Sequence, residues 1–282
     1  MEWKVKMGPT NCAILASVLI GFLSCNNGNH GPEPVKPTLP QQLVGNVNAK
    51  YGYPGGSGTL LVKKFFIILH DNGKKIPAWV MYRLTNEDLQ GTAERSDDFR
   101  PDPELPVGKR AELIDYKNSG YDRGHMAPAA DFTRSDSAMS ETFLLSNMTP
   151  QRSHLNRGVW EHLEEQVRTF TQNRGSIWIV TGSLFIDESG RRCGPFAWIG
   201  PDSVAVPTHF FKAILSELAS GTHEMFAFIL PNWSSGLSDP TQNYLVSVDS
   251  VGKVSGLDLF DALPDSEEAG LEAKVAVEWL VQ

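Results

Sequence analysis

The sequence is short of cysteine and of positive charge, and it has no apolar run long enough to cross a bilayer. It holds 3 cysteines among 282 residues, with no CxxC pair and no Cys/His cluster. This spacing argues against a structural zinc site and a redox dithiol. Its 25 lysines and arginines face 33 acidic residues, a net charge of −8, which argues against a general basic coat for nucleic acid. A local basic patch is still compatible with this charge.

The first 24 residues predict a signal peptide. Lys4 and Lys6 precede an apolar run over residues 12–23, which is too short for a hydrocarbon core of about 30 Å but suits the h-region of a signal. Cys25 follows Ser24 directly after this run and resembles the cleavage site of a bacterial lipoprotein. The resemblance implies cleavage before Cys25, lipidation of its thiol and a location in a bacterial cell envelope, anchored to a membrane that faces the periplasm or the exterior. An ordinary secretory signal is the alternative.

Residues 25–42 predict a lipid-anchored tether, and residues 43–282 predict a single domain. The tether holds Pro32, Pro34, Pro37 and Pro40 with almost no apolar side chain, a composition typical of a semi-stiff spacer. The remaining chain has no internal repeat and no second linker of this kind.

Within the domain, strand and helix signals alternate without a regular βαβ period, which favours an α+β fold. Asp71, Asn72 and Gly73 predict a hairpin turn between the first two strands. The helix over 156–172 has the clearest apolar stripe. Strands are expected over 65–70, 76–84, 176–185, 204–206, 209–215 and 224–230, and helices over 135–145, 156–172 and 266–281.

The first stretch that carries chemistry is Asp-Arg-Gly-His at residues 122–125, followed by Met-Ala-Pro. His125 offers a base near neutral pH, and Arg123 offers a planar fork that suits phosphate or carboxylate. Gly124 allows the backbone to bend so that both side chains can reach one site. Asp122 could orient a neighbour or close an ion pair. Taken alone, the stretch also fits a surface loop with an Asp–Arg pair and an exposed histidine.

The second stretch is the helix that Asn156 is expected to begin. Trp160, Glu164 and Arg168 follow Asn156 at four-residue steps, so all four are expected within roughly 120° of one polar flank. Asn156 can give a carbonyl oxygen to a hard cation, Glu164 can bind a water of that cation, and Arg168 can hold a phosphate oxygen. An ordinary capped helix with a Glu164–Arg168 pair fits the same residues.

Together the two stretches resemble the DNA/RNA non-specific endonucleases of the ββα-metal type, the His-Me finger nucleases. The resemblance covers most of the chain from about residue 50 and implies a central, mostly antiparallel sheet flanked by helices. The downstream residues that match, at the spacing of the family, are Asn147, Pro150, Gln151, Leu155, Asn156, Trp160, Glu164 and Arg168.

This resemblance also implies a role for each site residue. His125 would be the general base, and Asn156 would be the sole direct protein ligand of Mg²⁺, which Mn²⁺ can replace. Glu164 would steady a water of the metal, and Arg123 and Arg168 would hold the phosphate. The further residues that it implies are Asn147, which would support the active-site loop, and Arg95 and Asp122 as substrate contacts.

These roles predict a Mg²⁺-dependent endonuclease that hydrolyses the phosphodiester bonds of both DNA and RNA, because phosphate contacts carry little sequence information. Two other interpretations are a phosphodiesterase that acts on small substrates and a non-catalytic surface lipoprotein. A binding module needs no base beside a metal ligand, so His125 together with Asn156 favours the nuclease.

Overall fold

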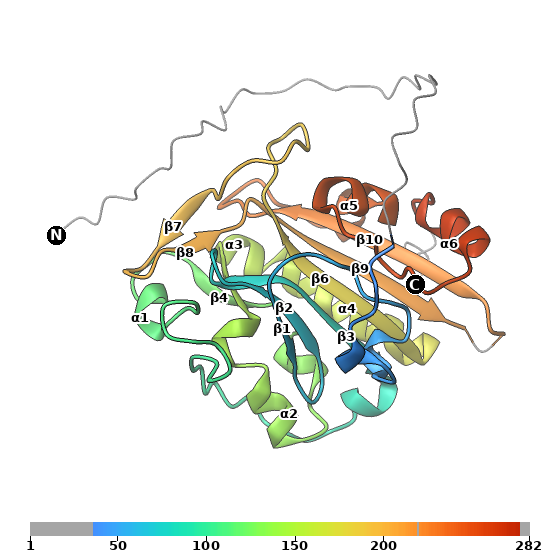
Figure 1. The fold of residues 1–282 in the computed structure, drawn as a ribbon, viewed down its shortest axis with the longest axis horizontal. Coiled ribbons are helices and arrows are strands. Elements are labelled where there is room, and N and C mark those ends of the chain that lie inside the picture. Colours follow the sequence, from blue (N-terminus) through green and yellow to red (C-terminus); the bar gives the residue numbers. More distant parts are fainter. Residues whose placement is uncertain (1–35, 219, 277–282) are drawn as a thin grey trace.

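The computed structural model describes residues 36–218 and 220–276. Its centre is a seven-stranded sheet in the order β1-β2-β3-β6-β9-β10-β11, and every neighbouring pair is antiparallel (Figure 1). Two shorter ladders, β4–β5 and β7–β8, lie outside this sheet. The strands are β1 (Thr59–Val62), β2 (Ile67–Asp71), β3 (Ile76–Thr85), β4 (Asp122–His125), β5 (Met148–Gln151), β6 (Ser176–Leu184), β7 (Ala197–Ile199), β8 (Val204–Val206), β9 (His209–Glu217), β10 (His223–Pro231) and β11 (Leu245–Val246).

Helices cover both faces of the large sheet (Figure 1). α4 packs on one face, and α5 and α6 pack on the other, together with the segment that precedes β1. The prediction of an α+β fold with a central antiparallel sheet is confirmed. The helices are α1 (Leu113–Tyr116), α2 (Asp136–Glu141), α3 (Ser153–Asn156), α4 (Val159–Arg174), α5 (Val248–Ser255) and α6 (Asp265–Glu272).

Strand β6 shows why the sheet is buried on both faces. Side chains alternate along a strand, so Ile177 and Ile179 point into the core beneath α4, whereas Trp178 and Val180 point into the core beneath α5. All four are apolar and buried. A strand that is buried on both faces has a continuous run of apolar residues. This run is why the sequence predicts β6 well.

The predicted hairpin between β2 and β3 is confirmed. Asp71 pairs with Ile76 across it, and the Asp71 carboxylate accepts hydrogen bonds from the backbone N–H groups of Gly73 and Lys74, both at 2.9 Å. The short helix after residue 135 is also present. Ser135 caps α2 by accepting a hydrogen bond from the Ala138 N–H at 3.2 Å.

The longest helix begins three residues later than the sequence predicts. Asn156 is the last residue of α3, and α4 begins at Val159. Gly158 separates the two, because its backbone (φ −130°, ψ −119°) is not helical and a Cβ there would lie 2.6 Å from the carbonyl oxygen of His154. The expectation that Trp160 shares a polar flank with Asn156 is also wrong, since Trp160 is buried in the core.

The helix predicted over 266–281 is shorter. α6 ends at Glu272, and residues 274–276 have no regular structure. Its predicted end at 277–281 lies outside the described residues, as do the predicted signal peptide (1–24), Cys25 and most of the tether.

Candidate active site

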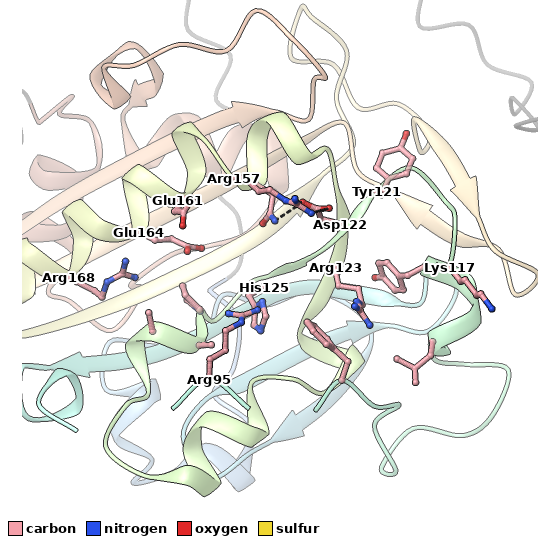
Figure 2. A pocket seen from close by; sticks show the side chains of 17 residues that line it. Arg95, Lys117, Tyr121, Asp122, Arg123, His125, Arg157, Glu161, Glu164 and Arg168 are labelled. Atoms are coloured by element: carbon pink, nitrogen blue, oxygen red, sulfur yellow. Dashed lines mark hydrogen bonds and ion pairs between the residues drawn. The ribbon is translucent and has the colours of Figure 1, made fainter. Parts of the chain in front are cut away.

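An open pocket of about 850 Å³ lies where β4 meets α3 and α4 (Figure 2). Its walls come from segments that are distant in the sequence, and most of its charged side chains are basic. The ionisable residues that line it are Arg95, Lys117, Tyr116, Tyr121, Asp122, Arg123, His125, Arg157, Glu161, Glu164 and Arg168.

The Asp-Arg-Gly-His motif forms strand β4, rather than a loop. β4 pairs antiparallel with β5 in the register Asp122↔Gln151 to His125↔Met148. Because side chains alternate along a strand, Arg123 and His125 share one side of β4 with the preceding Tyr121. All three line the pocket.

Gly124 is required by the close approach of β5. A Cβ at this position would lie 2.0 Å from Oε1 and 2.5 Å from Cγ of Gln151, whose side chain is fully buried. The motif therefore keeps a glycine between its arginine and its histidine because the two strands pack too closely for any side chain.

Phe99 and Phe143 contact the His125 imidazole, and each also contacts the guanidinium group of an arginine. The imidazole lies edge-on to Phe143, with ring centroids 4.9 Å apart, and tilted against Phe99 at 5.8 Å. The Arg123 guanidinium stacks over Phe99 at 3.8 Å, and that of Arg95 lies 4.9 Å from the ring centroid of Phe143. Planar guanidinium groups are attracted to aromatic faces, so both cations are held beside the imidazole.

This environment keeps His125 neutral. Burial, together with the positive charges of Arg95 and Arg123, lowers the pKa of His125 to about 3. Its Nε2 is buried and has no hydrogen-bond partner in the described part of the chain. A buried ring nitrogen without a partner is costly, so it points to a group that binds there during function.

Asn147 holds the loop that follows His125. Its Oδ1 accepts from the Ala127 N–H at 2.9 Å, and its Nδ2 donates to the carbonyl oxygens of Ala127 at 2.9 Å and Thr142 at 2.8 Å. Asn147 is fully buried and is not among the residues that line the pocket. Its hydrogen bonds therefore fix the backbone after His125 from outside the pocket.

Asp122 fixes the orientation of Asn156. Its carboxylate accepts two hydrogen bonds from Arg157, both at 2.8 Å, and one each from Asn156 Nδ2 and Ser153 Oγ, both at 3.0 Å. Burial raises the pKa of Asp122, but these hydrogen bonds outweigh it and lower the pKa below its ordinary value. Asp122 is thus hydrogen-bonded to three neighbouring side chains and orients Asn156 from the pocket wall, and its predicted contact with substrate stays a prediction.

Only one atom of the Asn156 side-chain amide, its oxygen, is available to a ligand. Its Nδ2 is used by Asp122, and no hydrogen bond within the described residues engages its Oδ1. Asn156 lines the pocket from the end of α3, and Glu164 lines it from the second turn of α4. The two stretches still share one pocket despite the break at Gly158.

Arg168 and Glu164 rest on a buried polar network. Arg168 donates to Asp131 at 3.2 Å, and the Tyr82 hydroxyl donates to the other oxygen of Asp131 at 2.7 Å. Lys212 on β9 is fully buried and donates to Thr181 at 3.0 Å.

The charges of this network act on Glu164. Burial raises its pKa to about 7; Lys212 and Arg168 oppose the increase, and Asp131 adds to it. Burial likewise lowers the pKa of Lys212, while Glu164 and Asp131 oppose that decrease. The protonation states of Glu164 and Lys212 are therefore linked to each other and to the charge of Asp131.

Seven of the eight residues proposed from the sequence for substrate, metal or catalysis line this pocket, and Asn147 lies apart from it. Sequence reasoning did not assign roles to Lys117, Tyr121 and Glu161, which also line it, or to the phenylalanine pair and Asp131. Tyr121 could have been found from its alternation with Arg123 and His125. Lys117 and Asp131 carry no such signal, since only the tertiary fold brings Lys117 to the pocket and Asp131 to Arg168.

A paired strand that carries a histidine and an arginine, packed against a helix that carries a glutamate and an arginine, defines a ββα-type nuclease site. The profile of the DNA/RNA non-specific endonucleases matches residues 44–266, and the chain belongs to this family.

Several relatives agree with this assignment. The chain is 40% identical over 238 residues to a nuclease of Syncephalastrum racemosum, an alignment that covers 80% of this chain and 74% of that protein. It is 37% identical over 213 residues to the mitochondrial endonuclease G of Homo sapiens, covering 74% and 71%. Among solved structures, a chain of the EndoG/EndoGI complex matches with a TM-score of 0.73 and 32% identity, covering 82% of this chain and 96% of that one.

The family and these relatives establish that the protein is a nuclease, a hydrolase that acts on nucleic acid. Among the helices that the structure describes, none is both long and apolar enough to cross a membrane.

Proposed function

We propose that this protein is a Mg²⁺-dependent endonuclease that hydrolyses the phosphodiester bonds of both DNA and RNA, with Mn²⁺ able to replace Mg²⁺. The observation that carries the proposal is the neutral imidazole of His125, which lines one pocket with Asn156, Glu164 and Arg168 and whose buried Nε2 has no hydrogen-bond partner among the described residues. A base, an oxygen ligand and phosphate-binding cations in one pocket are what phosphodiester hydrolysis requires.

His125 acts as the general base. Because its imidazole is neutral, Nε2 can accept the proton of the water that attacks phosphorus, and such a base contributes about 10²–10⁴-fold to the rate. Bound phosphate would partly neutralise Arg95 and Arg123, and this raises the proton affinity of the imidazole when it is needed.

The residues present fit a magnesium ion. Asn156 would hold it through Oδ1, and Glu164 would accept hydrogen bonds from its waters. Mg²⁺ prefers oxygen ligands and keeps several of its waters, so a single amide oxygen beside a carboxylate suits it. When bound, the ion supplies positive charge at the phosphate and at the leaving oxygen.

The arginines bind phosphate and make no contact that reads a base. Arg123 and Arg168 present planar forks from opposite walls of the pocket, one held by Phe99 and the other by Asp131. Contacts of this kind do not distinguish ribose from deoxyribose, which supports cleavage of both polymers.

The test uses the full chain with supercoiled plasmid and with total RNA, in Mg²⁺ and in EDTA. Wild type should degrade both in Mg²⁺ alone, and His125→Ala should reduce the rate by about 10²-fold or more. Asn156→Ala should raise the Mg²⁺ concentration needed for half-maximal rate. His162→Ala, which removes an exposed histidine on α4, is the matched control. Undiminished cleavage by His125→Ala would refute the assignment of the base.

We also propose that residues 1–24 are removed, that Cys25 is lipidated and that residues 25–42 tether the catalytic domain, residues 43–282, to a membrane of a bacterial cell envelope. The apolar run before Cys25 supports this proposal. Labelled palmitate should enter the wild-type protein and not Cys25→Ser, and only the wild type should sediment with membranes. Equal labelling of both would refute the assignment of Cys25.

A further inference from the structure

A second group of side chains continues the catalytic strand pair beyond the pocket. The β4–β5 register ends at Asp122↔Gln151, and one further step of the same ladder brings Tyr121 opposite Arg152. The Arg152 guanidinium lies 4.1 Å from the ring centroid of Tyr121 and 5.9 Å from that of Phe196. We call Tyr121, Arg152 and Phe196 the stacking platform.

The platform stands on a fixed backbone. The Arg152 N–H donates to Asn232 Oδ1 at 2.8 Å, and Asn232 Nδ2 donates to the carbonyl oxygens of Pro150 and Pro207, both at 3.0 Å. Phe196 is held at its own N–H, which donates to the Val206 carbonyl at 2.9 Å. A preorganised backbone lowers the entropy that binding must offset.

The charge of Arg152 is available to a ligand. Three other arginines of the site are paired with acids: Arg157 with Asp122, Arg168 with Asp131 and Arg95 with Asp97. Within the described residues, the Arg152 guanidinium has no acidic partner and lies only against aromatic rings.

The platform also presents an aromatic face to solvent. Phe196 is 52% exposed, so part of its apolar surface is open to a ligand. Figure 2 shows Tyr121 at the end of the pocket opposite Arg168, with His125 between them. Tyr121, Arg123 and His125 alternate along β4, so neighbours on this side are about 6.6 Å apart, similar to one nucleotide step along an extended strand.

We propose that the stacking platform is a substrate subsite that binds an unpaired nucleotide next to the one being cut, with Arg152 on its phosphate and Phe196 against its base. The proposal rests on the nuclease function. A base can stack on Phe196 only if it has left its neighbours, so the subsite accepts single-stranded DNA or RNA and rejects the same nucleotide inside a duplex. It therefore makes the enzyme favour single-stranded segments.

The experiment compares a single-stranded 20-mer with a duplex of the same sequence, using the full chain. Phe196→Ala and Arg152→Gln should each raise KM for the single strand by roughly tenfold and leave kcat unchanged, because stacking and phosphate contacts act on binding. KM for the duplex should change less than twofold in Phe196→Ala, and in Arg152→Gln it should rise by a smaller factor than KM for the single strand. Phe196→Tyr keeps the ring and should match wild type, and Arg134→Gln removes a cation remote from this pocket as the charge control.

Two further arms separate this proposal from the nuclease proposal. Bis(p-nitrophenyl) phosphate is too small to reach the platform, so the variants should cut it as wild type does. In the His125→Ala background and in EDTA, where no cleavage is expected, fluorescence anisotropy should show the same loss of affinity for the single strand. Equal effects on single strand and duplex, or no effect on either, would overturn the subsite even if wild type proves to be a fully active nuclease.

Discussion

At the scale of single residues, the charge state of His125 follows from its neighbours. Phe99 and Phe143 cover part of the imidazole and at the same time hold Arg123 and Arg95 beside it. Both effects disfavour the imidazolium, so the free enzyme holds a neutral base over the whole physiological pH range.

Removing the charge of Arg95 should therefore raise the pKa of His125, because one of the two nearby positive charges that oppose protonation is lost. NMR titration of labelled histidine in the metal-free protein should give a pKa well below 6.5 in the wild type and a higher one in Arg95→Gln. Lys117→Gln removes a different cation of the pocket and should leave the value unchanged. If Arg95→Gln behaves like that control, the charge of Arg95 does not contribute to the low pKa of His125.

Asn147→Ala should lower both stability and kcat. The substitution leaves the N–H and carbonyl of Ala127 and the carbonyl of Thr142 without their partner in a buried site, at a cost of about 2–5 kcal/mol in the free energy of unfolding. Urea denaturation measures this loss. Asn173→Ala, on the exposed face of α4, should stay within about 0.5 kcal/mol of wild type. An unchanged kcat in Asn147→Ala would contradict the positioning role.

At the scale of elements, the break between α3 and α4 decides where Asn156 points. An unbroken helix would place Asn156 on the same flank as Trp160, which is buried. The turn at Gly158 instead lets Asn156 reach Asp122 while Glu164 and Arg168 stay on the helix.

Gly158→Ala should weaken metal binding because it distorts the break between α3 and α4 that positions Asn156. Its Cβ would lie 2.6 Å from the His154 carbonyl oxygen, which belongs to the backbone, so α3 must move at a cost of about 1–3 kcal/mol. The expected result is a higher Mg²⁺ requirement for cleavage together with lower stability in urea. Gly270→Ala in α6 meets nothing within 4 Å and should be neutral or slightly stabilising. An unchanged Mg²⁺ requirement would mean that the break does not position Asn156.

The elements also show where the sequence is informative. β6 and the β2–β3 hairpin are predicted well because their apolar runs and turn residues are local signals. The break at Gly158 is missed because a glycine within a helical pattern is usually tolerated, and only the contact with His154 makes it a boundary here. The support of Arg168 by Tyr82 and Asp131 joins three distant segments, and no local pattern can reveal it.

At the scale of the whole molecule, an acidic protein must bind a polyanion with a few local cations. The chain carries a net charge of −8, yet Lys117, Arg123 and Arg152 lie in or beside the pocket without acidic partners in the described part of the chain. The repulsion between the rest of the surface and the substrate makes these few cations decisive.

Cleavage should accordingly depend steeply on salt. If three phosphates are neutralised, kcat/KM for single-stranded nucleic acid should fall roughly 20-fold between 50 and 200 mM salt. Lys117→Gln should flatten the log–log slope by about 0.7, whereas Lys64→Gln, remote from this pocket, should not. A slope that is the same in Lys117→Gln and wild type would exclude Lys117 from the binding surface.

The buried network beneath Arg168 has a consequence for biosynthesis. Lys212 lies on β9, late in the chain, and contributes to the charge of Glu164, while Tyr82 lies on β3, early in the chain, and holds Asp131. A growing polypeptide that has not yet reached β9 cannot assemble these side chains around the pocket. The pocket is therefore complete only once β3, α4 and β9 have folded together.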